Sequence, residues 1–183
     1  FRDVQVLSPM YRGEVGADAI NQDLQRALNP VGDSIERSGR VFRVGDKVMQ
    51  VRNDYDLEVY NGDLGRVTSI DHGSGTLSVS YERRGVQYPF GELEQLVPAY
   101  AITVHRAQGS EYPAVILPLT TDHFLMLKRN LLYTAITRGR RLVVLVGSRR
   151  ALDIAVHSRD ETGRHTGLAA RLRADGPPTT AVC

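Results

Sequence analysis

The spacing of apolar residues divides the chain into stretches of two kinds. Residues 4–30 begin with a short apolar run and continue with apolar residues at helical spacing, which predicts a strand, a loop and a helix. Residues 99–157 repeat this alternation: 114–119 and 142–146 are apolar throughout, as buried parallel strands are, and 125–137 has a helical pattern. We therefore expect an α/β fold with a parallel sheet flanked by helices.

The middle of the chain has a different pattern. Turn-forming residues become dense, and apolar and polar residues alternate with a period of two in short runs, which predicts four or five antiparallel strands. So few strands usually bury enough surface and hide their edges by curling into a small barrel. We expect this antiparallel β-barrel at residues 42–97, after a loop around residues 32–39.

The other boundaries follow from the insert. Residues 1–41 and 98–157 are expected to form the α/β part. Its strands carry their own apolar residues, so we expect it to need no barrel residue to complete the sheet. Residues 158–183 turn polar and are expected to form a tail.

Composition narrows the classes of protein that fit. The chain has 183 residues, 42% of them hydrophobic and 24% charged, so it can bury a core and fold. No run of about 18 apolar residues occurs, and we expect no membrane partner. The only cysteine is Cys183, which excludes intrachain disulfides and cysteine-ligated zinc and favours a cytoplasmic location. The net charge is only +2.

Lysine is scarce, and its positions exclude one motif. Lys47 and Lys128 are the only lysines, and the other basic residues are arginines, which suit phosphate groups. A codon bias of the genome explains the scarcity equally well. A phosphate-binding P-loop needs a lysine followed by serine or threonine, whereas Val48 and Arg129 follow the two lysines. This chain alone cannot be a complete P-loop ATPase.

Three stretches carry candidate chemistry. In AYAITVHRAQGSE a strand runs into Thr103 and a polar turn follows, where Thr103 and His105 could donate to a phosphate oxygen. In the same stretch Gly109 would allow a ligand close to the backbone, and Glu111 would accept from a ribose hydroxyl. Solvated polar side chains on an ordinary turn are the alternative.

The second stretch, NLLYTAITRGRRLVVLVG, places Arg138 where a helix ends and a buried strand begins. An arginine held there could stabilise charge in phosphoryl transfer, or it could simply face water at the helix C-terminus. The third stretch, LSPMYRG, ends a strand at Ser8 and Pro9. It could grip a nucleic-acid backbone or be an ordinary loop.

Taken together, these stretches resemble the second RecA-like domain of a superfamily 1 DNA helicase of the RecD-like branch. AITVHRAQGSE is similar to that family's motif V, YTAITRGRR to its motif VI and VLSPMYRGEVGADAIN to its motif IV region. GDKVMQVRNDYDLEVYNGDLGRV resembles the small Src-homology-three-like barrel that these helicases carry between motifs IV and V. The resemblance covers roughly residues 4–150.

The resemblance implies roles for individual residues. Arg138 would contact the γ-phosphate of ATP as the catalytic arginine, and Gly109 and Glu111 would lie at the nucleotide. Gly139 stands where many relatives have alanine, a departure that leaves the arginine of the motif unchanged. The expected DNA-binding residues are Ser8, Pro9, Thr103 and His105, joined by Arg52, Asn61 and Arg66 because their loops or strands in the barrel could meet the strand backbone.

The resemblance also implies a motor. Such helicases bind ATP between two RecA-like domains and move along single-stranded DNA, and the resemblance to this branch implies a 5′-to-3′ direction. Walker A and Walker B motifs are missing, so the first RecA-like domain of the same protein would hold the P-loop and Mg²⁺, and no metal ligand is expected here. We expect ATP as substrate, single-stranded DNA and single-strand/duplex junctions as partners, and no ATPase activity in this segment alone.

Two other classes of function remain open. The barrel could serve a non-catalytic module that binds single-stranded nucleic acid, because it combines arginines with four tyrosines, although alternating tyrosines are more often core than stacking platforms. It could also be a protein-interaction barrel on an inactive ATPase remnant. In either alternative motifs V and VI would be free to drift, yet both are intact.

Overall fold

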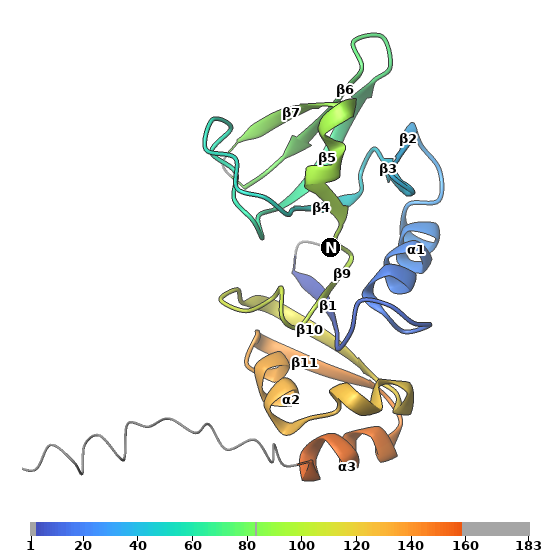
Figure 1. The fold of residues 1–183 in the computed structure, drawn as a ribbon, viewed down its shortest axis with the longest axis vertical. Helices are drawn as coiled ribbons and strands as arrows, with labels where there is room; N and C mark the ends of the chain where they lie inside the picture. Colours follow the sequence, from blue (N-terminus) through green and yellow to red (C-terminus); the bar gives the residue numbers. More distant parts are fainter. Residues whose placement is uncertain (1–2, 83, 159–183) are drawn as a thin grey trace, which may run out of the picture.

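Four parallel strands form the sheet around which the larger part of the molecule is built (Figure 1). The computed structural model describes residues 3–82 and 84–158. The strands lie in the order β11-β10-β1-β9, and every pairing is parallel. They are β1 (Val4–Ser8), β9 (Ala101–Thr103), β10 (Tyr112–Leu119) and β11 (Gly139–Gly147). The two apolar runs of the second half are thus neighbouring strands. The expectation that both are buried holds for β10 but is wrong for β11, which is an edge strand with most of its side chains exposed.

Helices lie against this sheet. The helix α1 (Ala17–Leu28) contacts β9, α2 (Arg129–Ile136) packs on β10 and β11, and α3 (Arg149–His157) packs on α2. The Ser148 hydroxyl caps α3 by accepting from the backbone N–H of Ala151. The helix expected over 125–137 begins later, at Arg129, because a 3₁₀ segment, η2 (Thr121–Met126), precedes it.

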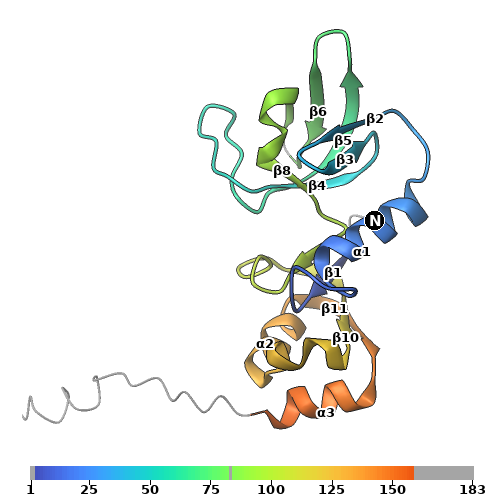
Figure 2. The same ribbon diagram turned by 45° about the vertical axis from the view of Figure 1, so that its right-hand side comes forward.

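The inserted unit is a five-stranded antiparallel sheet (Figure 2). Its order is β7-β6-β5-β4-β8, so β7 and β8 lie at its edges. A 3₁₀ segment, η1 (Phe90–Gln95), joins these two edge strands. The strands are β4 (Lys47–Gln50), β5 (Leu64–Asp71), β6 (Thr76–Ser80), β7 (Gly85–Pro89) and β8 (Leu96–Pro98). The first four match the alternating runs, whereas the short β8 was not predicted.

A separate hairpin precedes this sheet, where the sequence predicted only a loop. Strands β2 (Ser34–Arg37) and β3 (Arg40–Arg43) pair across a turn in which Ser38 and Gly39 both have positive φ. Phe42 of the hairpin is fully buried in the core of the inserted unit. We therefore propose that the insert includes the hairpin and begins near Ser34.

The two parts of the molecule share a core. Met49 of β4 and Val97 of β8 are buried in the same cluster as Leu7 and Ile102 of the parallel sheet. The parallel sheet does take all its strands from outside residues 42–97. The sheet is thus complete without the barrel, whereas the core also contains these two barrel side chains.

The expected fold class is confirmed: a parallel sheet with flanking helices carries an inserted antiparallel unit. The polar tail expected at 158–183 lies, apart from Ser158, outside the described residues. No helix in the described part of the chain combines the length and the apolar character needed to cross a membrane.

Candidate nucleic-acid and nucleotide sites

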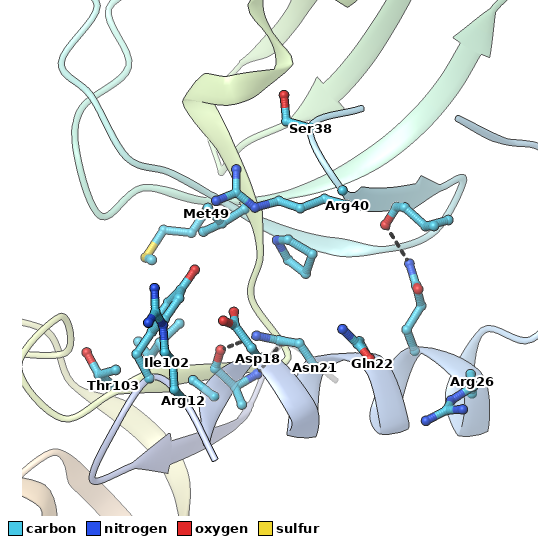
Figure 3. Close-up of a pocket in the computed structure, with 18 of the residues that line it drawn as sticks. Arg12, Asp18, Asn21, Gln22, Arg26, Ser38, Arg40, Met49, Ile102 and Thr103 are labelled. Atoms are coloured by element: carbon cyan, nitrogen blue, oxygen red, sulfur yellow. Dashed lines mark hydrogen bonds between the residues drawn. The ribbon is translucent and has the colours of Figure 1, made fainter. Parts of the chain in front are cut away.

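A cavity of about 840 Å³ lies between α1 and the β2–β3 hairpin, and we call it the arginine groove (Figure 3). Its lining comes from α1 and the loop before it, from the hairpin, and from the ends of β8 and β9. Asp18 is the only acidic residue lining it within the described ranges. The basic residues that line it are Arg12, Arg26, Arg40, Arg43 and Arg106.

Several of these arginines have no acidic partner. Arg26 pairs with Asp23, at 2.6 Å between side-chain atoms, and the Arg43 guanidinium donates to a backbone carbonyl. Among residues 3–82 and 84–158, no carboxylate forms an ion pair with Arg12, Arg40 or Arg106. The groove therefore carries uncompensated positive charge, which suits a polyanion such as a nucleic-acid backbone.

Thr103, from the stretch that is similar to motif V, lines this groove. It is half-buried at the last position of β9 and lines the cavity, and its hydroxyl oxygen accepts from the backbone N–H of Arg106 at 3.3 Å. The Arg106 guanidinium lies over the ring of Tyr11, 5.8 Å from its centroid. His105 is exposed on the turn that follows β9 and does not line the groove.

Ser8 and Pro9 were expected to face the bound DNA strand, but both are buried. The Ser8 hydroxyl lies 2.8 Å from the Met10 carbonyl oxygen and 3.0 Å from that of Val15, so it closes the loop between β1 and α1. Buried polar groups need such partners. Ser8 thus shapes the loop that carries Arg12 and presents no free hydroxyl.

The nucleotide candidates lie together at the amino ends of β10 and β11. The Arg138 guanidinium donates to the Ser110 carbonyl oxygen at 3.1 Å and to that of Thr134 at 3.2 Å. Glu111 next to Ser110 accepts from the Arg140 side chain at 2.7 Å, and both are well exposed. Gly109 has φ +85°, a conformation that favours glycine. Arg138, Gly109 and Glu111 are therefore close in space, as the resemblance requires.

The two candidate sites lie at opposite ends of the parallel strands. Thr103 is at the carboxyl end of β9, level with Ser8, whereas Glu111 and Arg138 immediately precede β10 and β11. The groove therefore lies where ligands generally bind in open α/β sheets, whereas the nucleotide candidates lie at the opposite ends of the strands. Residues 104–111 connect the two sites, so a displacement of the backbone at Gly109 would be transmitted along this segment to Thr103.

The barrel residues predicted to bind DNA do not join the groove. Arg52 forms an exposed ion pair with Glu94, at 2.8 Å, and Asn61 lies on the same long loop between β4 and β5. Arg66 lines a second cavity of about 640 Å³, which lies between the barrel and residues 110–113. Lys47 also lines it, and burial lowers the pKa of this lysine to about 8.

Sequence reasoning missed Tyr11, Arg12, Arg40 and Arg106. Arg12 and Arg106 each lie a few residues after a predicted strand end, which is a signal that could have found them. Arg40 could not be found, because its position depends on a hairpin that the pattern indicated as a loop. Within the described residues, no cluster of histidine, cysteine, aspartate and glutamate could hold a metal ion.

Two family models match the chain on either side of residue 98. Residues 20–81 match the SH3 domain of the ATP-dependent RecD-like DNA helicases, and residues 98–146 match the C-terminal domain of the UvrD-like helicases. The chain is 42% identical to the ATP-dependent RecD2 DNA helicase of Deinococcus radiodurans over 93% of its own length and 24% of the relative's. It is 32% identical to the RecBCD enzyme subunit RecD of Mycolicibacterium smegmatis, over 90% of the chain and 28% of the relative.

Solved structures show the same fold. A Pif1 helicase from Bacteroides, solved with ADP-AlF3 and single-stranded DNA, matches with a TM-score of 0.60 at 20% identity, over 93% of this chain and 45% of that one. A Pif1 structure at forked duplex DNA matches with a TM-score of 0.61 at 19% identity, over 96% of this chain and 44% of that one.

Fold, motifs and matches together define the C-terminal motor region of a helicase, a RecA-like sheet with an SH3-like insert. The chain belongs to the RecD-like helicases of superfamily 1. It spans about a quarter of the length of the curated relatives it matches.

Proposed function

We propose that the full-length protein is an ATP-dependent DNA helicase in which this segment holds single-stranded DNA and completes the ATP site. The observation that supports this most is the arginine groove, where Arg12, Arg106 and Thr103 gather at one end of the strands. The phosphates of single-stranded DNA can contact the arginines that line this groove. These contacts reach the backbone and not base edges, so the grip does not depend on sequence.

The nucleotide edge would supply Arg138. When ATP and its Mg²⁺ are held by the first motor domain of the same protein, ATP supplies the phosphoryl group that is transferred to water. Arg138 would then exchange its contact with the Ser110 carbonyl for the γ-phosphate and stabilise the charge that develops there. Glu111 would orient the ribose, and Gly109 lets the backbone approach it. No metal ligand is proposed in this segment.

Movement would come from the link between the two edges. Exchange of the Arg138–Ser110 contact would shift the Gly109 loop, and residues 104–111 would carry this shift to Thr103 and His105. The grip on DNA would thus alternate with the nucleotide cycle. We propose 5′-to-3′ translocation, single-strand/duplex junctions as substrates and a cytoplasmic location.

The barrel-centred binding module is the weaker alternative. Tyr81 and Tyr88 are buried and their hydroxyls contact each other at 2.7 Å, so they belong to the core and cannot stack on bases. Only Tyr55 and Tyr60 are exposed among the four tyrosines considered. The loop that carries them also holds Asp54, Asp56 and Glu58, which repel a phosphate backbone.

Strand displacement by the full-length protein tests the proposed function. The substrates are duplexes with a 5′ or a 3′ single-stranded tail, and ATP-dependent displacement of the 5′-tailed duplex is expected. Arg12→Ala should weaken single-strand binding in the same protein, whereas Arg129→Ala, an exposed arginine at the start of α2 outside the groove, should not. Failure to displace either duplex in the presence of ATP would refute the proposal.

A further inference from the structure

The β2–β3 hairpin forms the wall of the arginine groove opposite α1, and Arg40 is one of the hairpin residues that line it. Arg40 extends from the hairpin over the cavity while Arg12 lies on the other side (Figure 3). Arg37, also on the hairpin, lies over the ring of Phe90, 5.8 Å from its centroid, and does not line the groove. The hairpin therefore points Arg40 and Arg43 into the groove and Arg37 away from it, but the Arg43 guanidinium already donates to the Asn29 carbonyl oxygen at 2.7 Å.

A buried carboxylate fixes this hairpin to α1. Asp46, just after β3, has no exposed surface, and each of its two oxygens accepts two hydrogen bonds. Oδ2 accepts from the Gln25 side chain at 2.5 Å and from the backbone N–H of Arg43 at 2.7 Å. Oδ1 accepts from the Asn29 side chain at 2.7 Å and from the Tyr100 hydroxyl at 2.9 Å.

These four donors come from three separate pieces of the chain. Gln25 belongs to α1 and Asn29 is the C-cap of this helix, Arg43 ends the hairpin, and Tyr100 lies between β8 and β9. Gln25 also donates to the Val41 carbonyl oxygen of β3 at 2.9 Å. Buried charge-assisted hydrogen bonds have strict geometry, so Asp46 sets the distance between helix and hairpin, and with it the width of the groove.

We propose that Arg40 is a second-wall contact for the phosphate backbone of single-stranded DNA, and that Asp46 is the positioning residue that holds Arg40 over the strand. The inference rests on the proposed DNA-binding role of the groove. It adds a contact from the inserted unit to those from the parallel sheet, so that the strand is enclosed between the two parts of the molecule.

The test of Arg40 measures binding of a fluorescent oligothymidylate to the full-length protein over a range of salt concentrations. Arg40→Ala should weaken binding on the order of tenfold and lower the slope of log affinity against log salt by about 0.7, the value for one phosphate contact on a single strand. Arg37→Ala removes the same charge from the same hairpin and should change binding less than about twofold. Equal effects of the two variants would overturn the role of Arg40.

The test of Asp46 is a double-mutant cycle. Asp46→Asn should weaken oligothymidylate binding in the wild-type background but cause little further loss when combined with Arg40→Ala, because it acts through that residue. Glu36→Gln, an exposed carboxylate on the hairpin, removes the same charge and should not weaken binding. Additive losses would overturn the positioning role. If Asp46→Asn does not fold, Tyr100→Phe removes one donor and takes its place in the cycle.

Two further variants separate this inference from the proposed function. If Arg12→Ala and Thr103→Ala weaken oligothymidylate binding but Arg40→Ala does not, the groove binds DNA and only the second wall is refuted. If none of the three changes binding, the DNA-binding role of the groove itself is refuted, and the inference with it.

Discussion

Replacement of Arg138 by alanine separates a structural role from a catalytic one by magnitude. The guanidinium makes three hydrogen bonds, to Ser110, Thr134 and Thr137, at 3.1 to 3.2 Å. Net contributions of about 0.5–1.5 kcal/mol per bond, reduced by solvent exposure, give a loss of unfolding free energy of about 1–3 kcal/mol. An arginine that stabilises the transition state of phosphoryl transfer contributes about 10³–10⁵ in rate, or about 4–7 kcal/mol.

We expect Arg138→Ala in the full-length protein to lower the ATP turnover rate by at least about a thousandfold while ATP binding stays within severalfold. The assay pairs DNA-stimulated ATPase kinetics with nucleotide binding and with thermal unfolding. Arg129→Ala is the matched control, because it removes an exposed arginine at the start of α2, whereas Arg138 follows the end of this helix. A turnover rate within tenfold of wild type for Arg138→Ala would refute the catalytic role.

Three further predictions follow from particular contacts. Thr103→Ala or His105→Ala should weaken single-strand binding and reduce DNA stimulation of ATPase equally for different base sequences; a strongly sequence-dependent loss would contradict a phosphate contact. Burial lowers the Lys47 pKa from 10.5 to about 8, so between these pH values the unfolded chain binds more protons than the folded one. The unfolding free energy of the segment should therefore rise as pH increases from about 8 to 10, and Lys47→Met should abolish this rise when unfolding by a chemical denaturant is measured across the pH series. Deleting residues 42–98 and rejoining the flanks should leave the α/β part unfolded or aggregated, because the core loses Met49 and Val97; a cooperative unfolding transition of the remainder would contradict this.

The sequence pattern located the parallel sheet better than the insert. Residues 114–119 are continuously apolar and form the largely buried strand β10, which has a strand on each side. Residues 142–146 have the same pattern but lie on the edge strand β11, where Leu142 and Val146 are more than half exposed. The strands β2, β3 and β8 were not predicted because they are short and stabilised by tertiary contacts. Phe42, for example, is buried only because the hairpin folds onto the barrel.

The candidate sites likewise have a part that the sequence predicted and a part that depends on tertiary contacts. Thr103, Gly109, Glu111 and Arg138 could be named because motif similarity needs no three-dimensional information. Which of them meet, and which arginines join them, depends on pairings between distant residues. The burial of Ser8 and the carboxylate hub at Asp46 are of this kind, since every partner of Asp46 outside its own turn is at least 17 residues away.

The most direct test of the account is ATP hydrolysis by the full-length protein with and without single-stranded DNA. A helicase built from this segment and a P-loop domain should hydrolyse ATP slowly alone and many times faster when oligothymidylate is added, and Thr103→Ala should reduce that stimulation while leaving the DNA-free rate unchanged. A purified, folded, full-length protein that binds ATP but shows no stimulation by single-stranded DNA would contradict the claim that this segment couples a DNA grip to a nucleotide site.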